Sequence, residues 1–315
     1  MSGWITMLIG IGVIAGLLGL TTAMIWIERR GLAWFQDRLG PNRVGPAGLL
    51  QPIADVIKLF MKEDWIPPFA DKLVFVLAPM IVVITVLFAF AVVPFTEQIK
   101  VSDANVGLLF FLGMTSLSVY SIALAGWASN SKYSLIGGLR GAAQMISYEI
   151  PMAVSLVGVV MLAGSFRLID IVNAQSGLWF IVTQPLGFVI FLIAGFAEAR
   201  RTPFDLPEAD SEIVAGYHTE YSSMKFALFF MGEYLDLILI SVMTTVLFLG
   251  GWHGPFLPPI VWFLIKTFAL IFLFIWVRAV LPRYRFDQLM GFGWKALLPL
   301  SLLNVLVTGA VALAR

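Results

Sequence analysis

The sequence has 315 residues, of which 60% are hydrophobic and only 12% are charged, and its formal net charge is +1. A soluble domain has nearer ~45–50% apolar residues, so this composition and a mean hydropathy of +0.93 exclude an ordinary soluble domain. The small net charge argues for neither nucleic acid nor an acidic partner. The absence of cysteine excludes disulfides, thiolate metal sites and iron–sulfur ligation.

Long apolar runs predict an all-α polytopic membrane protein with about eight transmembrane helices, because about 20 apolar residues cross a bilayer. No positively charged, cleavable signal segment precedes the first run, so we expect that run to be a retained helix. No clear internal repeat is present, and we expect one integral membrane domain over residues 1–315. The predicted spans are roughly 4–27, 73–95, 106–127, 144–164, 178–197, 226–250, 258–280 and 294–313.

Sixteen of the 20 lysines and arginines fall on one side of these spans. The positive-inside rule therefore predicts an outer N-terminus and cytoplasmic loops at about 28–72, 128–143, 198–225 and 281–293. His218 and His253 then fall at opposite faces of the membrane, which excludes a bis-histidine haem between helices. Any electron transfer must therefore use cofactors held by another chain.

The first cytoplasmic connection contains a glycine- and proline-rich turn at 40–46 and then an amphipathic segment at 49–62. The apolar residues of this segment recur at helical spacing, while Asp55, Lys58 and Lys62 share another face. This pattern predicts a helix lying at the cytoplasmic membrane interface.

The third connection is unusually acidic. Asp205 and Glu208 have the spacing of a helix N-cap and its reciprocal carboxylate, and a helix starting there would align both with Glu212. Capping alone is a sufficient structural explanation for these two residues. The stretch holds six carboxylates against Arg200, Arg201 and His218 before Lys225: Glu198, Asp205, Glu208, Asp210, Glu212 and Glu220.

Three further carboxylates fall within predicted spans: Glu149, Glu233 and Asp236. A charge at mid-membrane costs ~2.5–3.5 kcal/mol even on the mildest scale, and is by default a functional candidate with a partner. The expected partners are Arg140, Arg201, Lys266 and one another. Such carboxylates in low dielectric cannot all ionise, so some of their pKa values should rise towards neutrality. A chain of such groups, bridged by water, can pass protons. The structural alternative is that each pair merely ties helices together.

The first span, the segment 49–62 and the sixth span could enclose an apolar slot that opens to lipid and suits a long isoprenoid ligand. Aromatic residues are also common in membrane helices without any such role. The residues expected to line the slot are Trp34, Phe35, Phe60, Phe229 and Phe230.

Four long stretches resemble the NuoH-type family of membrane subunits of respiratory complex I, the proton-translocating NADH:quinone oxidoreductase. They are IERRGLAWFQDRLGPNRVGPAGLLQPIADVIKLFMKED, GWASNSKYSLIGGLRGAAQMISYE, AEARRTPFDLPEADSEIVAGYHTEYSSMKFALFF and WVRAVLPRYRFDQLM. They occur in the family's order, and the resemblance covers nearly the whole chain.

The resemblance implies a subunit of an enzyme in the bacterial cell inner membrane, with no redox centre or metal of its own. Quinone would be its substrate, while flavin and iron–sulfur clusters would belong to partner subunits of the membrane and peripheral arms. These partners would include the subunits that carry the terminal iron–sulfur cluster and the quinone headgroup site. Membrane lipid, and no nucleic acid, would complete its surroundings.

The same resemblance implies roles for individual residues. Where many relatives read EAESE, this chain reads EADSE at 208–212, and Asp210 shifts the charge by about one methylene. The quinone entrance and chamber would use Glu28, Arg29, Arg38, Asp55, Lys58, Phe60, Glu63 and Phe229. The charged path coupling quinone reduction to proton pumping would use Arg140, Glu149, Glu198, Arg201, Asp205, Glu208, Asp210, Glu212, Glu220 and Glu233.

Three alternatives stay open at this point. A protein of the same family could couple a membrane-bound hydrogenase or another donor complex. A stand-alone proton-coupled transporter is a second alternative, against which the lack of repeats and of broken helices counts. A structural anchor that docks a peripheral arm is the third.

Overall fold

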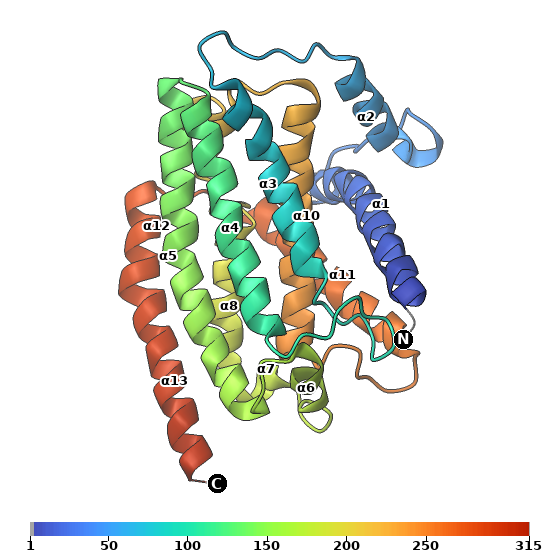
Figure 1. Cartoon of the computed structure of the whole chain (residues 1–315), viewed down its shortest axis with the longest axis vertical. Coiled ribbons are helices and arrows are strands. Elements are labelled where there is room, and N and C mark those ends of the chain that lie inside the picture. The colour runs from blue at the N-terminus through green and yellow to red at the C-terminus, as the bar shows by residue number, and fades with distance from the viewer. Residues whose placement is uncertain (1–2, 315) are drawn as a thin grey trace.

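The computed structural model describes residues 3–314, except the side chains of Ile5, Thr6, Asp210 and Ser211, and the regular elements in this range are all helical (Figure 1). The predicted all-α class is confirmed. Seven helices of the described range are long and apolar enough to cross a membrane. They are α1 (Gly3–Phe35), α3 (Lys72–Phe90), α4 (Gly107–Ala128), α5 (Lys132–Ala163), α10 (Ser223–Phe248), α11 (Pro259–Val280) and the run Phe286–Leu313. That last run joins α12 (Phe286–Phe292), the π-helical segment η3 (Gly293–Leu297) and α13 (Leu298–Leu313).

The predicted span 178–197 is interrupted. It contains α7 (Phe180–Thr183) and α8 (Pro185–Glu198), and the 14 residues of α8 extend only ~21 Å at 1.5 Å per residue. Gln184 leaves the helical conformation just before Pro185, and its side-chain amide donates to Thr308 Oγ1 and accepts from Asn304. The expectation that no helix is broken is therefore wrong, because α13 supplies polar partners for the break.

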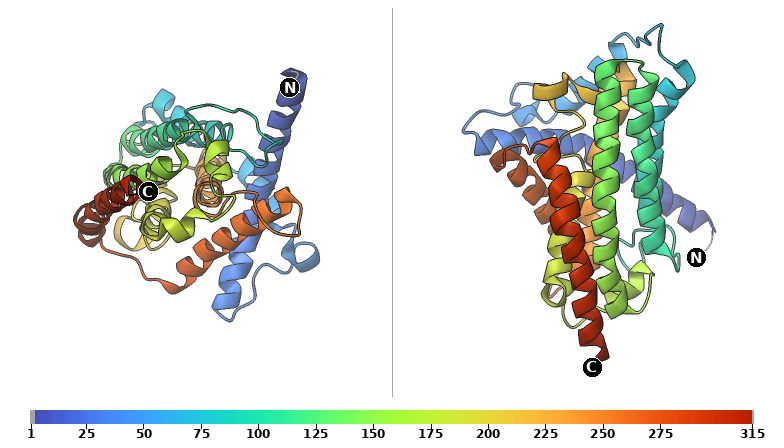
Figure 2. Two further views of the ribbon diagram at one scale, coloured as in Figure 1. Left: turned by 90° about the horizontal axis from the view of Figure 1, so that it is seen from below. Right: turned by 90° about the vertical axis from the view of Figure 1, so that its left-hand side faces the viewer.

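Helix α10 runs through the middle of the bundle, with α3, α8 and α11 around it (Figure 1). Helices α4, α5 and α13 continue the bundle on one side. On the other side α1 is strongly inclined, and the short helix α2 (Gln51–Met61) lies across its C-terminal end (Figures 1 and 2). The predicted amphipathic helix is therefore confirmed. Because α10 is the most interior helix, Glu233 and Asp236 lie inside the protein.

The stretch 128–143, predicted as a cytoplasmic loop, is mostly helix because α5 begins at Lys132. Its glycines allow close packing: a Cβ on Gly138 would lie 3.1 Å from Gly126 Cα of α4, and one on Gly137 would lie 2.6 Å from the Tyr217 backbone nitrogen. Small residues are the usual means of bringing membrane helices together. The predicted loops 28–72 and 281–293 likewise include helical residues, since α1 continues to Phe35 and α12 begins at Phe286.

Replacing Gly137 with alanine should destabilise the protein although alanine favours helices by ~1 kcal/mol. The new methyl group would overlap the backbone of Gly216 and Tyr217, and overpacking of this kind costs about 1–3 kcal/mol. The matched control is Gly113→Ala on α4, where nothing lies within 4 Å of the added Cβ. Size-exclusion chromatography after heating should show a lower half-aggregation temperature for Gly137→Ala alone. Equal behaviour of the two variants would contradict the predicted overlap.

Candidate functional site

The acidic connection between α8 and α10 folds into the protein as an irregular segment. The helix predicted to start at Asp205 is absent; the only α-helix described there is α9 (Asp210–Ile213), followed by η2 (Gly216–His218). The prediction of an Asp205 cap is therefore wrong. The Gln144 amide of α5 donates to the carbonyls of Ala197 and Phe204 at 2.8 and 2.7 Å. These bonds satisfy buried backbone groups that a helix would otherwise have satisfied.

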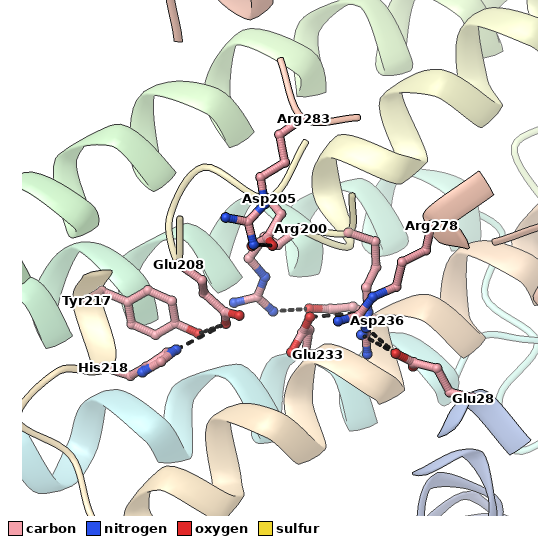
Figure 3. Close-up of polar contacts among 11 residues, drawn as sticks. Glu28, Arg200, Asp205, Glu208, Tyr217, His218, Glu233, Asp236, Arg278 and Arg283 are labelled. Carbon is pink, nitrogen blue, oxygen red and sulfur yellow. Dashed lines mark hydrogen bonds and ion pairs between the residues drawn. The ribbon is translucent and has the colours of Figure 1, made fainter. Parts of the chain in front are cut away.

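Arg201 lies at the centre of a buried ion-pair network, and Figure 3 shows Glu28, Glu233 and Arg278 among the residues of this network. Its Nη1 donates to Glu28 Oε1 of α1 at 3.1 Å, and its Nε lies 3.1 Å from Glu233 Oε1 of α10. Arg278 of α11 also donates to Glu28. The side chains of Arg201, Glu28 and Glu233 are each 5% exposed, so three helices and the acidic connection are joined by charges that water barely reaches.

A second buried pair lies beside the first. Arg200 Nη2 donates to Asp236 Oδ2 at 2.7 Å, and the Arg200 side chain has no exposed surface. Asp236 is one turn of α10 beyond Glu233. Glu198, at the end of α8, is also buried, with Asp236, Glu149 and Arg200 as charged neighbours. Glu149 of α5 accepts a hydrogen bond from Ser116 of α4. The carboxylates therefore follow one another from α10 towards α4 and α5.

Asp205 pairs with Arg283, whose Nη2 lies 2.7 Å from Asp205 Oδ2. Arg283 is therefore more than the topology charge that its position in a basic loop indicates. Burial, together with the negative charge of Glu208, raises the pKa of Asp205 to about 7, although Arg283, Arg278 and Arg201 act in the opposite direction. A carboxyl group with this pKa can change its charge near neutral pH.

Glu208 forms a third group with His218 and Tyr217 (Figure 3). His218 Nε2 lies 3.5 Å from Glu208 Oε1, and the Tyr217 hydroxyl donates to the same oxygen at 3.3 Å. Burial alone would raise the pKa of Glu208, but the hydrogen bond and charge of His218, with Arg200 and Arg201, lower it overall. Burial would lower the pKa of His218, but Glu208 outweighs this effect and raises it. The structure therefore favours the ionised pair.

Replacing His218 with glutamine should destabilise the protein most between about pH 4.5 and 6.5. The raised pKa of His218 stabilises the fold below its ordinary value of 6.5, and this contribution is lost as the pH rises through the raised value. The lowered pKa of Glu208 contributes above its ordinary 4.5 and is lost only in stronger acid. Half-aggregation temperatures of both proteins across this pH range measure the difference.

His253→Gln is a control of opposite sign. Burial and the charge of Lys266 lower the pKa of His253, so protonated His253 destabilises the fold in acid. Replacing His253 should therefore raise the half-aggregation temperature at low pH, whereas replacing His218 should lower it. A pH-independent effect of His218→Gln would contradict the ion pair with Glu208.

An apolar slot of about 440 Å³ lies between α1, α2 and α10, as predicted from the sequence. Leu18, Ile25, Met231 and Phe230 line its apolar part. At the α2 end, Arg29 Nη1 donates to Asp55 Oδ2 at 2.7 Å, and Lys58 Nζ lies 3.5 Å from Asp55 Oδ1. All three charged residues line the slot, so its walls are apolar with one polar end.

Tyr234 of α10 connects the slot to the ion-pair network. Its side chain lines the slot, and the guanidinium carbon of Arg201 lies 4.5 Å from the centre of its ring. A cation over an aromatic ring is attracted by the ring's negative face. The wall of the slot therefore contacts Arg201, the residue shared by Glu28 and Glu233.

The start of α10 contacts both α2 and the segment that follows it. Lys225 Nζ lies 2.5 Å from both oxygens of Asp64, and Ser223 Oγ donates to the Leu59 carbonyl at 2.9 Å. Asp64 and Lys225 were not among the residues predicted to matter. Their oppositely charged side chains lie far apart in the sequence, which gave no pairing signal.

Several residues predicted either for the slot or, from the resemblance, for the quinone chamber lie outside the slot lining. Phe229 is 1% exposed and packs edge-on against Tyr217 and Tyr221, because it falls on the interior face of α10. Phe35 packs on Phe272 of α11. Trp34 and Arg38 line a separate cavity on α1. Two exposed residues, Phe60 on α2 and Glu63 just after it, lie outside the slot lining. Glu28 also lies outside it.

The remaining predicted residues are distributed around the network. Arg140 Nη1 donates to Glu212 Oε2 at 2.5 Å near the surface. Within the described range Glu220 makes no ion pair, and the side chain of Asp210 lies outside the described residues. Lys266 pairs with no carboxylate in that range, contrary to expectation; its ammonium donates to the carbonyls of Leu249, Gly251 and His253 and lies over the Trp179 ring.

Sequence reasoning missed Arg200, Arg278 and Tyr234 as site residues. Arg200 sits beside Arg201 in a basic pair, and a pair of arginines after a span is also what orients a membrane helix. The signal that distinguishes them is the excess of nearby carboxylates. No group of His, Asp or Glu in the described part of the chain is arranged to hold a metal ion.

Comparison with known proteins gives consistent matches over nearly the whole chain. The family model for NADH dehydrogenase matches residues 8–309. The chain is 59% identical over 307 residues to an NADH-quinone oxidoreductase H-type subunit of Geobacter metallireducens, covering 95% of this chain and 93% of the relative. It is 57% identical over 305 residues to the NADH-quinone oxidoreductase H-type subunit of Methylococcus capsulatus, covering 96% of each.

Proposed function

Because the chain belongs to the NADH dehydrogenase family, we propose that its slot and ion-pair network form the quinone entrance and the start of the charge-coupling path of an NADH-quinone oxidoreductase. The chain is an integral membrane subunit of such an oxidoreductase complex. In this proposal it lies in the bacterial inner membrane with its N-terminus outside. The names of its relatives favour NADH over hydrogen as the electron source.

The observation that carries the proposal is the contact between Tyr234 and Arg201. Tyr234 lines an apolar slot suited to an isoprenoid tail, and Arg201 bridges Glu28 and Glu233 inside the protein. A change of charge or position at the slot therefore has a direct route to buried carboxylates. In low dielectric such a change acts strongly on their protonation.

The chain supplies no redox chemistry in this proposal. Reduction of a quinone consumes electrons, delivered through flavin and iron–sulfur clusters of partner subunits, and protons. Asp205 and Glu233 respond first, because both interact electrostatically with Arg201. Glu198 and Glu149 then change their protonation in turn, and they pass this change towards neighbouring membrane subunits.

The test uses the native assembly, purified in mild detergent and reconstituted into vesicles. Quinone-dependent NADH oxidation that a quinone-site inhibitor blocks, with proton uptake that Glu233→Gln abolishes, would support both parts of the proposal. Reduction of quinone only from another donor would overturn the choice of NADH. Normal proton uptake in Glu233→Gln would overturn the charge path.

Glu212→Gln should lower coupled activity while leaving assembly intact. The Glu212 side chain is 39% exposed beside Arg140, and such pairs contribute only about 0–1 kcal/mol to stability. The rate of proton uptake, divided by the amount of assembled complex on a native gel, separates the two effects. Normal uptake would remove Glu212 from the path.

A further inference from the structure

A second cavity of about 440 Å³ lies on α1, on the side of the helix opposite the slot. The slot uses Leu18, Ile25 and Arg29 of α1, whereas this cavity uses Trp26, Arg30 and Trp34, among others. At 3.6 residues per turn these two sets point in different directions. The cavity is therefore separate from the proposed quinone entrance.

The cavity is lined by two arginines and by no acidic residue. Arg30 and Arg38 both line it, and neither makes an ion pair with a carboxylate in the described range; Arg38 instead donates to the Gln36 side chain. Arg29, one residue before Arg30, is neutralised by Asp55 on the slot side. The helix thus carries a paired cation towards the slot and, within the described range, an unpaired one towards this cavity.

Arg30 is held in position. Its Nη1 donates to the Ala47 carbonyl at 2.8 Å, and its guanidinium carbon lies 5.4 Å from the centre of the Trp26 ring. The Trp26 indole donates to the same carbonyl at 3.1 Å. The remaining guanidinium nitrogens are free of described acidic partners, so the cation is oriented without being neutralised.

The walls of the cavity are apolar and open. Trp34 and Leu39 are 75% and 85% exposed, and tryptophan side chains gather where a membrane meets water. A free phosphate would use the arginines but not these apolar walls. A lipid with a charged phosphate and apolar chains would use both, since arginine pairs strongly with phosphate.

We propose that this cavity binds the phosphate headgroup of an anionic phospholipid, with Arg30 and Arg38 on the phosphate and Trp26 and Trp34 against the glycerol and upper acyl chains. The site lies at the C-terminal end of α1, among the residues that the basic-residue distribution assigns to the cytoplasmic side. Juxtamembrane arginines attract anionic lipids at such a surface. The resemblance to known relatives assigned Arg38 to the quinone chamber, whereas its position favours this lipid site.

The test is photolabelling of the whole complex in phosphatidylcholine nanodiscs that contain a diazirine-bearing phosphatidylglycerol. Labelled peptides of this chain are mapped by mass spectrometry. We expect label on residues 26–42, competed by unlabelled phosphatidylglycerol but not by phosphatidylcholine or inorganic phosphate. Equal competition by phosphatidylcholine or by inorganic phosphate, or label absent from this segment, would overturn the proposal.

Variants make the test specific. Arg30→Gln with Arg38→Gln should reduce labelling of this segment by about tenfold or more, because two charge-assisted bonds are lost. Arg285→Gln is the matched control, since Arg285 is exposed on the same predicted side and lines neither cavity. Unchanged labelling in the double variant would overturn the assignment. Competition in the unmodified complex decides the matter if the double variant does not assemble.

Discussion

Replacing Arg201 with methionine should abolish both assembly and inhibitor-sensitive NADH oxidation. The change leaves Glu233 buried without its ion-pair partner, and breaking a buried pair costs about 3–5 kcal/mol. Activity per membrane should fall by more than about a hundredfold. Native gels and NADH oxidation by membranes measure the two effects together.

The double variant Arg201→Met with Glu233→Gln isolates the charge imbalance. It removes both charges of one pair and leaves Glu28 paired with Arg278, so much of the assembly should return. Charge coupling should not return, because the route from Tyr234 to Glu233 is gone. Loss of assembly in both variants alike would show that Arg201 acts through packing and not through its charge.

Replacing Ala227 with tryptophan should close the slot to long-tailed quinones. Ala227 lines the slot between Phe226 and Leu228 on α10, and an indole at this position fills space that an isoprenoid tail would use. The KM for a long-tailed quinone should rise by about tenfold or more, equivalent to ~1.4 kcal/mol. A short-tailed quinone, which needs less of the slot, should be affected less.

Ala310→Trp on α13 is the control for the added bulk. Ala310 lines neither the slot nor the cavity on α1. It should leave the KM of both quinones unchanged. A rise in KM that does not depend on tail length would place the tail elsewhere and remove the slot from the proposed function.

The apolar runs and amphipathic periodicity were enough to predict most of the helices, because burial in lipid dominates their free energy. Two features could not be predicted from the apolar runs and the periodicity. Gln144 satisfies backbone groups of the acidic connection from 53 and 60 residues away, so a plausible local cap at Asp205 does not form. Likewise the hydrogen bond between Gln184 and Asn304 stabilises the break between α7 and α8, which hydropathy alone cannot predict.

The sequence predicted that a buried charge cluster exists, but it did not predict which residues pair within the cluster. An excess of acid beside and within the spans indicates a buried charge cluster, since anchoring needs far less. Which arginine meets which carboxylate depends on the rotation of α1, α10 and α11 about their axes. Arg200 and Arg201 are adjacent in the sequence yet bind different carboxylates, Asp236 and Glu233. Both follow the end of α8 at Glu198, and Arg200 has a positive φ of 53°.

Electroneutrality gives the cluster around Arg201 a further property. Glu28, Glu233, Asp236, Asp205 and Glu208 bring five formal negative charges, and Arg200, Arg201, Arg278 and Arg283 bring four positive ones. The difference is one negative charge, which a proton on His218 cancels. Since the arginines cannot supply more positive charge, an additional anion beside the cluster favours protonation of one of its carboxylates. The arrival of an anion in the slot would then be coupled to proton uptake by the buried network.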